Sequence, residues 1–296
     1  MNVAAHIPDG DEIPFSDADF KALAALAHAN FGLNLAESKK PLVYSRLIKR
    51  LKARGISSFR DYLALVEQPQ EDKERHELIS ALTTNVTSYF RENHHFEMLR
   101  DSCLPDIIRN AKAGKRARIW SAGCSSGQEP YSIAMQLLTA FPDAAAHDVK
   151  ILATDIDPRI VQKAEAGTYP KDEAKGIPAP MAQKWTRPSS DGKSFTIAPD
   201  AKKLITFGEL NLIKEWPFGG PFDVIFCRNV AIYFDQPTQQ TLWKRFCDIL
   251  APGGHLFIGH SERVSGPASQ SLAGVGITSY QKTENTLQNA NDRSLK

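Results

Sequence analysis

The sequence predicts an α/β fold, a doubly wound and mostly parallel sheet domain preceded by a small all-helical domain. Up to about residue 81 the apolar residues recur at helical spacing, and no strand alternation appears. After about residue 91, apolar runs of five or six residues alternate with amphipathic helices, a pattern typical of parallel strands covered on both faces. We expect a flexible N-terminus at 1–14, a helical domain at 15–84, a sheet domain at 85–282 and a disordered polar tail at 283–296.

The helical half divides into four predicted helices. The first has Ser16 or Asp17 as its N-cap and ends at Gly32, and the second, from residue 37, ends at Gly55. Two shorter helices are expected over 57–68 and 71–84. The apolar faces of the first two are formed by Phe20, Leu23 and Ala27, and by Leu42, Leu47 and Leu51.

The sheet half begins with a long predicted helix over 92–114. Residues 170–202 then interrupt the alternation with a Pro-rich polar stretch, and residues 192–207 resemble a β-hairpin. We interpret about 170–209 as an insertion on the sheet domain. The apolar runs that predict strands of the main sheet lie at 116–122, 147–157, 203–210, 220–230 and 253–262.

Composition excludes several classes of protein. A net charge of +2 does not favour nucleic-acid binding, and four distant cysteines without a CxxC pair suggest neither a zinc site nor a disulfide framework. His94 and His95 point in different directions on a helix and have no evident third ligand, so we expect no metal site. No apolar stretch is long enough to span a membrane, and we expect a cytoplasmic monomer that does not insert into membranes.

The turn after the first predicted strand, "SAGCSSGQEPYSIAM", lies where ligands bind in open α/β sheets. It has no GK[ST] element, and Gly123 and Gly127 are spaced GxxxG rather than GxGxxG, so a triphosphate or dinucleotide site is not indicated. Glu129 falls near the start of the next helix, where it would repel a pyrophosphate and attract a cation. The turn therefore predicts a positively charged nucleoside ligand.

Polar residues follow two further strands. Asp155 ends the second strand and can accept hydrogen bonds from both ribose hydroxyls, whereas Asp157 before Pro158 is typical of a helix N-cap. The Gly turn and Asp155 alone are weak signs of a nucleoside site, but with Glu129 they favour S-adenosylmethionine over NAD. In "FDVIFCRNVAIYF" an apolar strand runs into Arg228, Asn229 and Tyr233, which either cap the strand or face the reactive end of the ligand.

Six motifs occur along the chain: "TTNVTSYFRENHHFEML", "IWSAGCSSGQEPYSIAM", "TDID", "GELNL", "FDVIFCRNVAIYF" and "PGGHLFIGHSE". Together they resemble the CheR family, methyltransferases that esterify glutamate side chains on bacterial chemotaxis receptors. The resemblance extends from about residue 15 to 280 with the blocks in family order. It implies an all-helical N-terminal domain, a Rossmann-like methyltransferase domain with a small antiparallel β-subdomain, and S-adenosyl-L-methionine as methyl donor, with S-adenosyl-L-homocysteine as product.

The resemblance also implies roles for single residues. Arg91 and Tyr233 would act at the methyl-transfer centre by orienting the acceptor carboxylate; Glu129 would meet the methionine part of the cofactor and Asp155 the ribose. Without the resemblance, residues 83–88 would be interpreted as a polar linker. The full implied cofactor-binding set is Asn85, Thr87, Arg91, Gly123, Glu129, Asp155, Asn211, Leu212, Arg228 and Asn229.

Three positions depart from the family pattern. Gln128 stands where many members have an acid, Ala231 replaces a common Met, and Gly123 stands where Ala is usual. Because Glu129 is retained, we expect cofactor binding to be intact, whereas Ala231 affects how the pocket is packed.

Basic residues without an intervening acid occupy 39–60. Arg46, Arg50 and Arg54 share a helix face, and Lys49 lies beside it. The alternatives are a solvated face and, less favoured because aromatic residues are few, a nucleic-acid site. The resemblance favours docking on the acidic cytoplasmic methylation helices of chemotaxis receptors.

The β-subdomain and the loop after the last predicted strand each have more than one interpretation. Some family members bind a receptor C-terminal peptide at the β-subdomain, which residues 185–209 would form here, and the sequence does not say whether this chain does. His260 and Glu262 contact either ligand or structure. A methyltransferase for nucleic acids or small molecules would predict an N/DPPY-like motif where the chain has "RNVAIY". A non-catalytic module that binds S-adenosylmethionine as a signal is the remaining alternative.

A glutamate acceptor limits what the enzyme must do. Its carboxyl group, with a pKa near 4.3, is ionised at neutral pH, so attack on the sulfonium methyl needs no general base. The remaining tasks are alignment and removal of water.

Overall fold

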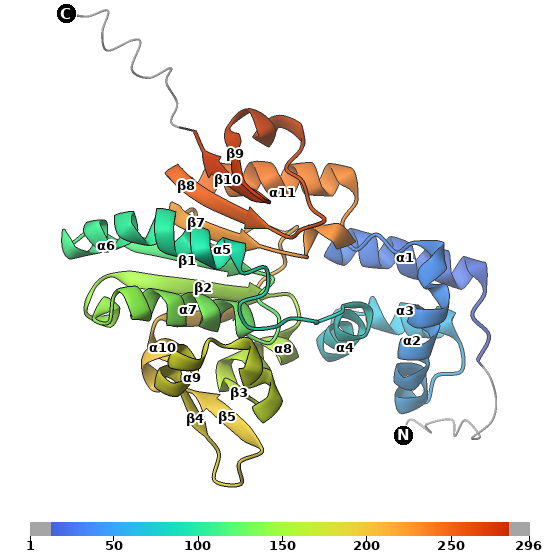
Figure 1. Cartoon of the computed structure of the whole chain (residues 1–296). Helices are drawn as coiled ribbons and strands as arrows, with labels where there is room; N and C mark the ends of the chain where they lie inside the picture. The colour runs from blue at the N-terminus through green and yellow to red at the C-terminus, as the bar shows by residue number, and fades with distance from the viewer. Residues whose placement is uncertain (1–12, 284–296) are drawn as a thin grey trace, which may run out of the picture. The chain divides into compact units, whose positions relative to one another are not determined.

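The computed structural model describes residues 13–283, which divide into two compact units. One unit contains residues 13–85 and the short segment 233–235, and the other contains 86–232 and 236–283 (Figure 1). The flexible ends predicted at 1–14 and 283–296 fall almost entirely outside the described residues. None of the described helices combines the length and apolarity that crossing a bilayer requires.

The four predicted helices of the first unit are present. Ser16 caps the first of them by accepting a hydrogen bond from the Asp19 amide, and Gly32 ends it in a left-handed conformation with φ 74°. Gly55 ends the second in the same way with φ 66°. Leu47 and Leu51 of the predicted apolar face of the second helix are buried. Leu42 is 42% exposed and Val43 is buried in its place, so the prediction for Leu42 is wrong. The helices are α1 (Asp17–Phe31), α2 (Lys40–Arg54), α3 (Phe59–Val66) and α4 (Asp72–Leu82).

A buried carboxylate joins α2, α3 and α4. Glu74 accepts hydrogen bonds from Arg50 Nε at 3.0 Å and Nη2 at 2.8 Å, and from Tyr62 Oη at 2.9 Å. The Glu74 side chain is only 2% exposed, against 26% for Arg50. The burial leaves Glu74 dependent on these partners, because an ionised carboxylate without donors is costly away from water. This interaction fixes α2 against α4.

The second unit is built on a seven-stranded sheet whose strand order is β6-β2-β1-β7-β8-β10-β9. The strands from β6 to β8 are parallel to their neighbours, and β10 is antiparallel to both β8 and β9. All five predicted strands are present, and the two short strands β9 and β10 are additions. The strands are β1 (Ala117–Ala122), β2 (Val149–Asp155), β6 (Ile205–Glu209), β7 (Phe222–Cys227), β8 (Leu250–Ile258), β9 (Leu272–Gly276) and β10 (Ser279–Lys282).

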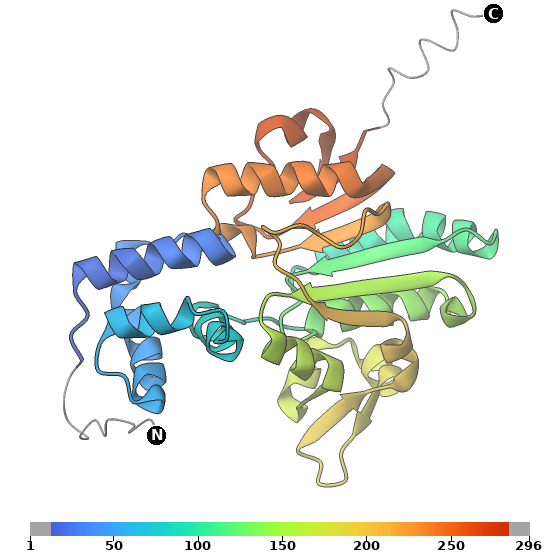
Figure 2. The same cartoon turned by 180° about the vertical axis from the view of Figure 1, so that it is seen from behind.

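Helices cover both faces of this sheet, as predicted. Figures 1 and 2 show α5, α6 and α7 along one face and α11 along the other. The long helix expected over 92–114 is divided by one π-helical turn at Leu99–Cys103, directly before α6. The bounds are α5 (His94–Met98), α6 (Leu104–Lys112), α7 (Gln128–Ala140), α8 (Pro158–Ala166) and α11 (Gln236–Ile249).

The insertion forms a separate antiparallel sheet of order β3-β5-β4. The predicted hairpin over 192–207 is wrong, because residues 205–209 pair in parallel with β2 and the hairpin is formed by β4 and β5. Phe207 contacts Tyr131 of α7 with ring centroids 5.7 Å apart, which draws this strand to the main sheet. The elements are β3 (Thr168–Pro170), η4 (Lys171–Gly176), α9 (Ala179–Trp185), β4 (Thr186–Pro188), β5 (Ser194–Ile197) and α10 (Pro199–Lys203).

The direction of strand addition reverses between β1 and β7. β2 and β6 follow on one side of β1, whereas β7 and β8 follow on the other. Such a switch point separates the loops that leave the carboxyl ends of the two central strands and opens a crevice for ligands. The turn at 123–127 and the loop after Cys227 leave the sheet at this point.

Replacing Glu74 with Ala should destabilise the helical unit. The substitution leaves the Arg50 guanidinium and the Tyr62 hydroxyl without their acceptor, and we expect a loss of about 3 kcal/mol in the free energy of unfolding. Urea unfolding of the full chain, followed by circular dichroism, measures this.

Glu77→Ala is the matched control. Glu77 pairs with the same Arg50 at 2.9 Å, but its side chain is 25% exposed, so the expected loss is below about 1 kcal/mol. Equal losses for the two variants would contradict the role given to the buried carboxylate.

Candidate functional site

The turn after β1 requires its two glycines. Gly123 and Gly127 have φ values of 81° and 96°, in the left-handed region. A Cβ on Gly123 would lie 2.3 Å from Val230 Cγ2, and one on Gly127 would lie 2.8 Å from Tyr169 Oη. The amides of Gly123 and Cys124 both donate to the Thr154 carbonyl at 2.8 Å. The turn is therefore held closely against the end of β2 and the loop after β7.

Asp155 ends β2 beside this turn and is 8% exposed. One carboxylate oxygen accepts from the Ser125 amide at 2.8 Å and the other from the Asp157 amide at 3.1 Å. Burial raises the pKa of Asp155 to about 6, although these amides favour the ionised form. Asp157 caps α8 by accepting from the Arg159 amide at 3.0 Å, which confirms the N-cap prediction.

Glu129, in the first turn of α7, forms a buried ion pair with Arg228. Its two oxygens accept from Ser121 Oγ at 2.6 Å and from Arg228 Nε at 2.7 Å. The side chains of Arg228 and Glu129 are 3% and 9% exposed. The sequence argument considered the charge of Glu129 alone and did not predict Arg228 as its partner; that Glu129 attracts a cationic ligand stays a prediction. The site presents two opposite charges side by side.

Arg228 also holds the segment that contains Arg91. Its guanidinium donates to the Arg91 carbonyl and lies over the rings of Phe96 and Phe226, with Cζ 5.4 and 5.7 Å from the ring centroids. Phe90 adopts a positive φ of 51°, and its amide donates to Ser132 Oγ of α7 at 3.0 Å. The Arg91 guanidinium donates to the Val86 carbonyl at 2.9 Å. The backbone of 90–92 is therefore held between α7 and the end of β7.

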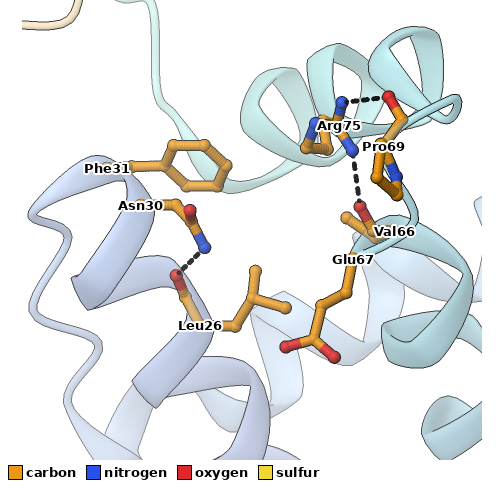
Figure 3. Close-up of a pocket in the computed structure, with 7 residues that line it drawn as sticks. All are labelled: Leu26, Asn30, Phe31, Val66, Glu67, Pro69 and Arg75. Carbon is orange, nitrogen blue, oxygen red and sulfur yellow. Dashed lines mark hydrogen bonds between the residues drawn. The ribbon is translucent and has the colours of Figure 1, made fainter.

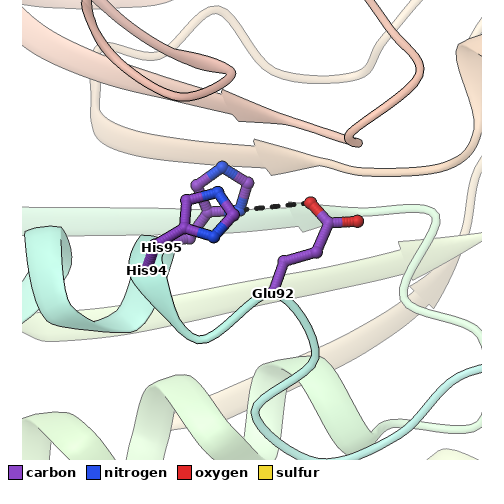
Figure 4. A group of neighbouring side chains, drawn as sticks. All are labelled: Glu92, His94 and His95. Atoms are coloured by element: carbon purple, nitrogen blue, oxygen red, sulfur yellow. Dashed lines mark ion pairs between the residues drawn. The ribbon is translucent and has the colours of Figure 1, made fainter.

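Three ionisable groups follow Arg91, and Figure 4 shows them together. The ligand atoms of Glu92, His94 and His95 all lie within 4.8 Å of one another, and the two histidine rings are 4.1 Å apart. The expectation that the two histidines point apart without a third group nearby was wrong.

The surroundings of His95 nevertheless favour a hydrogen-bond network over a metal site. Its Nδ1 lies 3.4 Å from Arg228 Nη1, and its Nε2 lies 3.0 Å from Thr278 Oγ1 and 3.2 Å from the Ile277 carbonyl. A neutral ring with its proton on Nε2 satisfies these partners. Burial, followed by the Arg228 charge, lowers the pKa of His95 to about 3, so the ring stays neutral. The prediction that the chain has no metal site stays a prediction.

Glu262, which the sequence left unassigned, is a structural anchor. Its carboxylate is buried and accepts from the amides of Asn229 at 3.1 Å, Val230 at 3.0 Å and Ile232 at 3.1 Å, and also from the amide of Gly259. Asn229 has a positive φ of 61°. One carboxylate therefore fixes the loop after β7 in a conformation that a non-glycine residue rarely adopts. His260 contacts Glu92 Oε1 through Nδ1 at 3.2 Å.

The remaining predicted cofactor residues follow β6 or lie near residue 86. The Leu210 amide donates to the Asp155 carbonyl at 2.9 Å, so the loop that begins with Asn211 and Leu212 leaves β6 beside the end of β2. Asn85 ends the helical unit, and Thr87 lies at the start of the sheet unit. Tyr233 belongs to the segment 233–235, which groups with the helical unit. The ligand roles of all predicted site residues stay predictions.

The predicted receptor-binding face does not consist of unpaired cations. Arg46 Nη1 donates to the Ala81 carbonyl at 3.1 Å and the Thr83 carbonyl at 3.0 Å, at the end of α4. Arg50 pairs with Glu74, and Arg54 pairs with Glu71 at 3.0 Å. The stripe at 46, 50 and 54 therefore packs against α4. Of the four predicted residues, Lys49 is the one for which the described contacts include no such partner.

The helical unit also contains a pocket, shown in Figure 3. Arg75 donates there to the carbonyls of Val66, Gln68 and Pro69, which holds the turn between α3 and α4. Asn30 Nδ2 donates to the Leu26 carbonyl at 3.0 Å. Since these polar groups serve the helices themselves, the pocket gives no sign of a ligand. Its lining is Leu26, Asn30, Phe31, Val66, Glu67, Pro69 and Arg75.

Comparison with known proteins identifies the family. Residues 18–83 match the "CheR methyltransferase, all-alpha domain" and residues 85–280 match the "CheR methyltransferase, SAM binding domain". The chain belongs to the CheR methyltransferase family. The sheet unit is therefore an S-adenosylmethionine-binding domain, and the resemblance found in the sequence is confirmed.

Relatives from three bacteria match nearly the whole chain. The probable chemotaxis protein methyltransferase of Rhizobium etli is 50% identical over 264 residues, which are 88% of this chain and 98% of that protein. The chemotaxis protein methyltransferase of Klebsiella aerogenes is 40% identical, covering 86% of each chain. That of Escherichia coli is 39% identical, covering 86% of this chain and 87% of that protein.

Affinity for S-adenosylhomocysteine should rise with pH across the titration of Asp155. The ionised carboxylate of Asp155 can accept hydrogen bonds from both ribose hydroxyls. Because the pKa of Asp155 is about 6, this carboxyl group is mostly protonated at pH 5. We expect the dissociation constant to be roughly tenfold larger at pH 5 than at pH 7.5 and to level off above pH 7. Isothermal titration calorimetry measures it.

Asp155→Asn provides the comparison for this pH series. The amide cannot ionise, so binding by the variant should be weaker than wild type at pH 7.5 and nearly constant between pH 5 and 7.5. A variant that keeps the wild-type pH dependence would show that another group is responsible.

Proposed function

We propose that this chain transfers the methyl group of S-adenosylmethionine to glutamate side chains of chemotaxis receptors, as a protein-glutamate O-methyltransferase acting in the cytoplasm. The observation that carries the proposal is the convergence of Asp155, Glu129 and Arg228 on the switch point of an S-adenosylmethionine-binding domain. The printed names of the relatives support an acceptor in the chemotaxis system.

The charges at the switch point match this cofactor better than a dinucleotide. The methionine end of S-adenosylmethionine is a zwitterion, and Glu129 and Arg228 offer one charge of each sign. Asp155 would hold the ribose, and Asn211 with Leu212 would flank the adenine, because both follow Leu210, which is bonded to Asp155. Asn85, Thr87, Arg91, Gly123 and Asn229 complete the proposed cofactor set.

The acceptor needs orientation rather than deprotonation. Bound S-adenosylmethionine supplies an electrophilic methyl group, and a glutamate carboxylate is already a nucleophile at neutral pH. Arg228 is paired with Glu129. The Arg91 guanidinium forms one hydrogen bond among the described residues, to the Val86 carbonyl. We assign Arg91 and Tyr233 to orienting the acceptor, since charge-assisted and hydroxyl hydrogen bonds set its direction. Too strong a bond from Arg91 would slow transfer, because the negative charge on the acceptor disappears during the reaction.

Receptor contacts are proposed for each unit separately. In the helical unit, Lys49 is the best candidate to face acidic methylation helices. Arg50 and Arg54 would contribute through the charge left exposed at the edge of their ion pairs, and Arg46 through a guanidinium that is bonded to backbone carbonyls. In the sheet unit, the small antiparallel sheet offers β4 as an edge strand to a receptor C-terminal peptide.

The decisive experiment follows the label. The full chain is incubated with S-adenosylmethionine labelled in its methyl group and with receptor cytoplasmic fragments. We expect label on the receptor that mild base releases as methanol, as a carboxyl ester requires. Label that resists base would overturn the glutamate assignment, and no label despite measurable cofactor binding would favour a binding module.

Tyr233→Phe should reduce turnover more than cofactor affinity. Removing the hydroxyl leaves the acceptor less well oriented, so we expect kcat to fall at least tenfold, with the dissociation constant for S-adenosylhomocysteine changing less than twofold. Tyr280→Phe, which removes a hydroxyl from β10 between β8 and β9, is the control. Wild-type turnover by Tyr233→Phe would remove the residue from the proposed mechanism.

A further inference from the structure

The small antiparallel sheet is bonded directly to the glycine turn after β1. Tyr169 Oη of β3 donates to the Ser126 carbonyl at 2.6 Å. Gln128 Nε2, at the start of α7, donates to Glu173 Oε2 of η4 at 2.8 Å. Both bonds are distant in sequence, spanning 43 and 45 residues. The insertion therefore touches the turn at two successive points, one on each side of Gly127.

Gln128 suits this position because an amide both donates and accepts. While its Nε2 donates to Glu173, its Oε1 accepts from Ser126 Oγ at 2.8 Å. The side chain of Gln128 is almost completely buried, at 2% exposure. A carboxylate here would keep the bond from Ser126 but would bring a second negative charge against Glu173.

The local helix alone would favour an acid at this residue. Gln128 is the first residue of α7, where a negative charge is stabilised by the helix dipole and the free amides. The presence of an amide is therefore explained by Glu173 and not by the helix. This accounts in physical terms for the departure at Gln128 that the sequence showed.

The same insertion also contacts the segment that precedes Arg91. The ring of Tyr89 lies edge-on to that of Tyr169 at 5.5 Å and is tilted against Phe195 of β5 at 6.1 Å. A Cβ on Gly176 would lie 3.3 Å from the Tyr89 carbonyl oxygen. The small sheet thus adjoins both backbone segments to which cofactor contacts are assigned, the turn at 123–129 and the segment at 87–91.

We propose that Gln128 and Glu173 form a positioning pair that holds the glycine turn in its cofactor-binding conformation, so that the insertion sets the affinity for S-adenosylmethionine. This rests on the proposed function for the identity of the ligand. Neither side chain needs to touch the ligand. Their bond holds the end of the turn at the start of α7, while Asp155 holds the turn through the Ser125 amide.

A charge exchange across the pair tests the proposal in the full chain. Gln128→Glu should weaken binding of S-adenosylhomocysteine about tenfold, because the carboxylates at 128 and 173 then repel each other and move the turn away from the insertion. Adding Glu173→Gln restores a donor–acceptor pair with the roles reversed, and we expect the double variant to recover binding to within threefold of wild type. Asp172→Asn, which removes a neighbouring exposed charge, is the control and should not change binding.

Two readouts separate positioning from general destabilisation. Calorimetry gives the dissociation constant, and hydrogen exchange of residues 123–128 without ligand reports the turn itself. We expect faster exchange there in Gln128→Glu, reversed in the double variant, with turnover at saturating cofactor changing less than twofold. Unchanged binding and exchange in Gln128→Glu, or no recovery in the double variant, would overturn the proposal.

Failure of the proposed function and failure of the positioning pair would give different results. If the wild-type chain bound no S-adenosylhomocysteine, the proposed function would fail, and the exchange of the turn would still decide whether the pair positions it.

Discussion

The buried ion pair between Glu129 and Arg228 is the interaction on which the geometry of the strand ends depends. Taking both charges out of water is costly, and the attraction between them repays this only if their remaining hydrogen-bonding groups are satisfied. Ser121 satisfies the second oxygen of Glu129, and the Arg91 carbonyl and His95 accept from Arg228. The need to complete this network joins β1, α7, the end of β7 and the segment at 90–92. Elements far apart in the sequence are thus fixed by one electrostatic requirement.

The anchoring of the surrounding loops follows the same pattern. A buried carboxylate accepts hydrogen bonds from backbone amides in each of these loops. Asp155 holds the turn after β1, and Glu262 holds the loop after β7. Both carboxyl groups have a raised pKa because burial outweighs the amides that stabilise the charge. Ser125 and Asn229, which both have a positive φ, lie in these loops. The carboxylates stabilise such conformations, because they accept hydrogen bonds from backbone amides that have no partner in a regular strand or helix.

The sequence predicted what depends on local periodicity and failed where a partner from another element decides. The five strands and four helices follow from apolar spacing, and the caps at Ser16, Gly32 and Gly55 follow from residue type. Helical spacing also placed Arg46, Arg50 and Arg54 on one face, but it could not show that α4 covers that face. A usable signal was present, since Glu71 and Glu74 are one helical turn apart and match the spacing of Arg54 and Arg50. The short strands β9 and β10 were missed because "LAGVG" and "SYQK" carry no long apolar run.

The ion pair also changes why the site favours S-adenosylmethionine. An unpaired Glu129 would select for any cationic nucleoside, because its field attracts positive charge of whatever shape. A buried pair has little net charge and attracts neither cations nor anions at long range. It instead favours a ligand that presents both charges at the separation of an ammonium and a carboxylate on one carbon atom. A dinucleotide has two negative phosphates and no adjacent ammonium, so it could match the Arg228 charge but not the Glu129 charge. Under the proposed function, selectivity for the zwitterionic methionine end would come from the pairing of Glu129 with Arg228, and not from the negative charge of Glu129 alone.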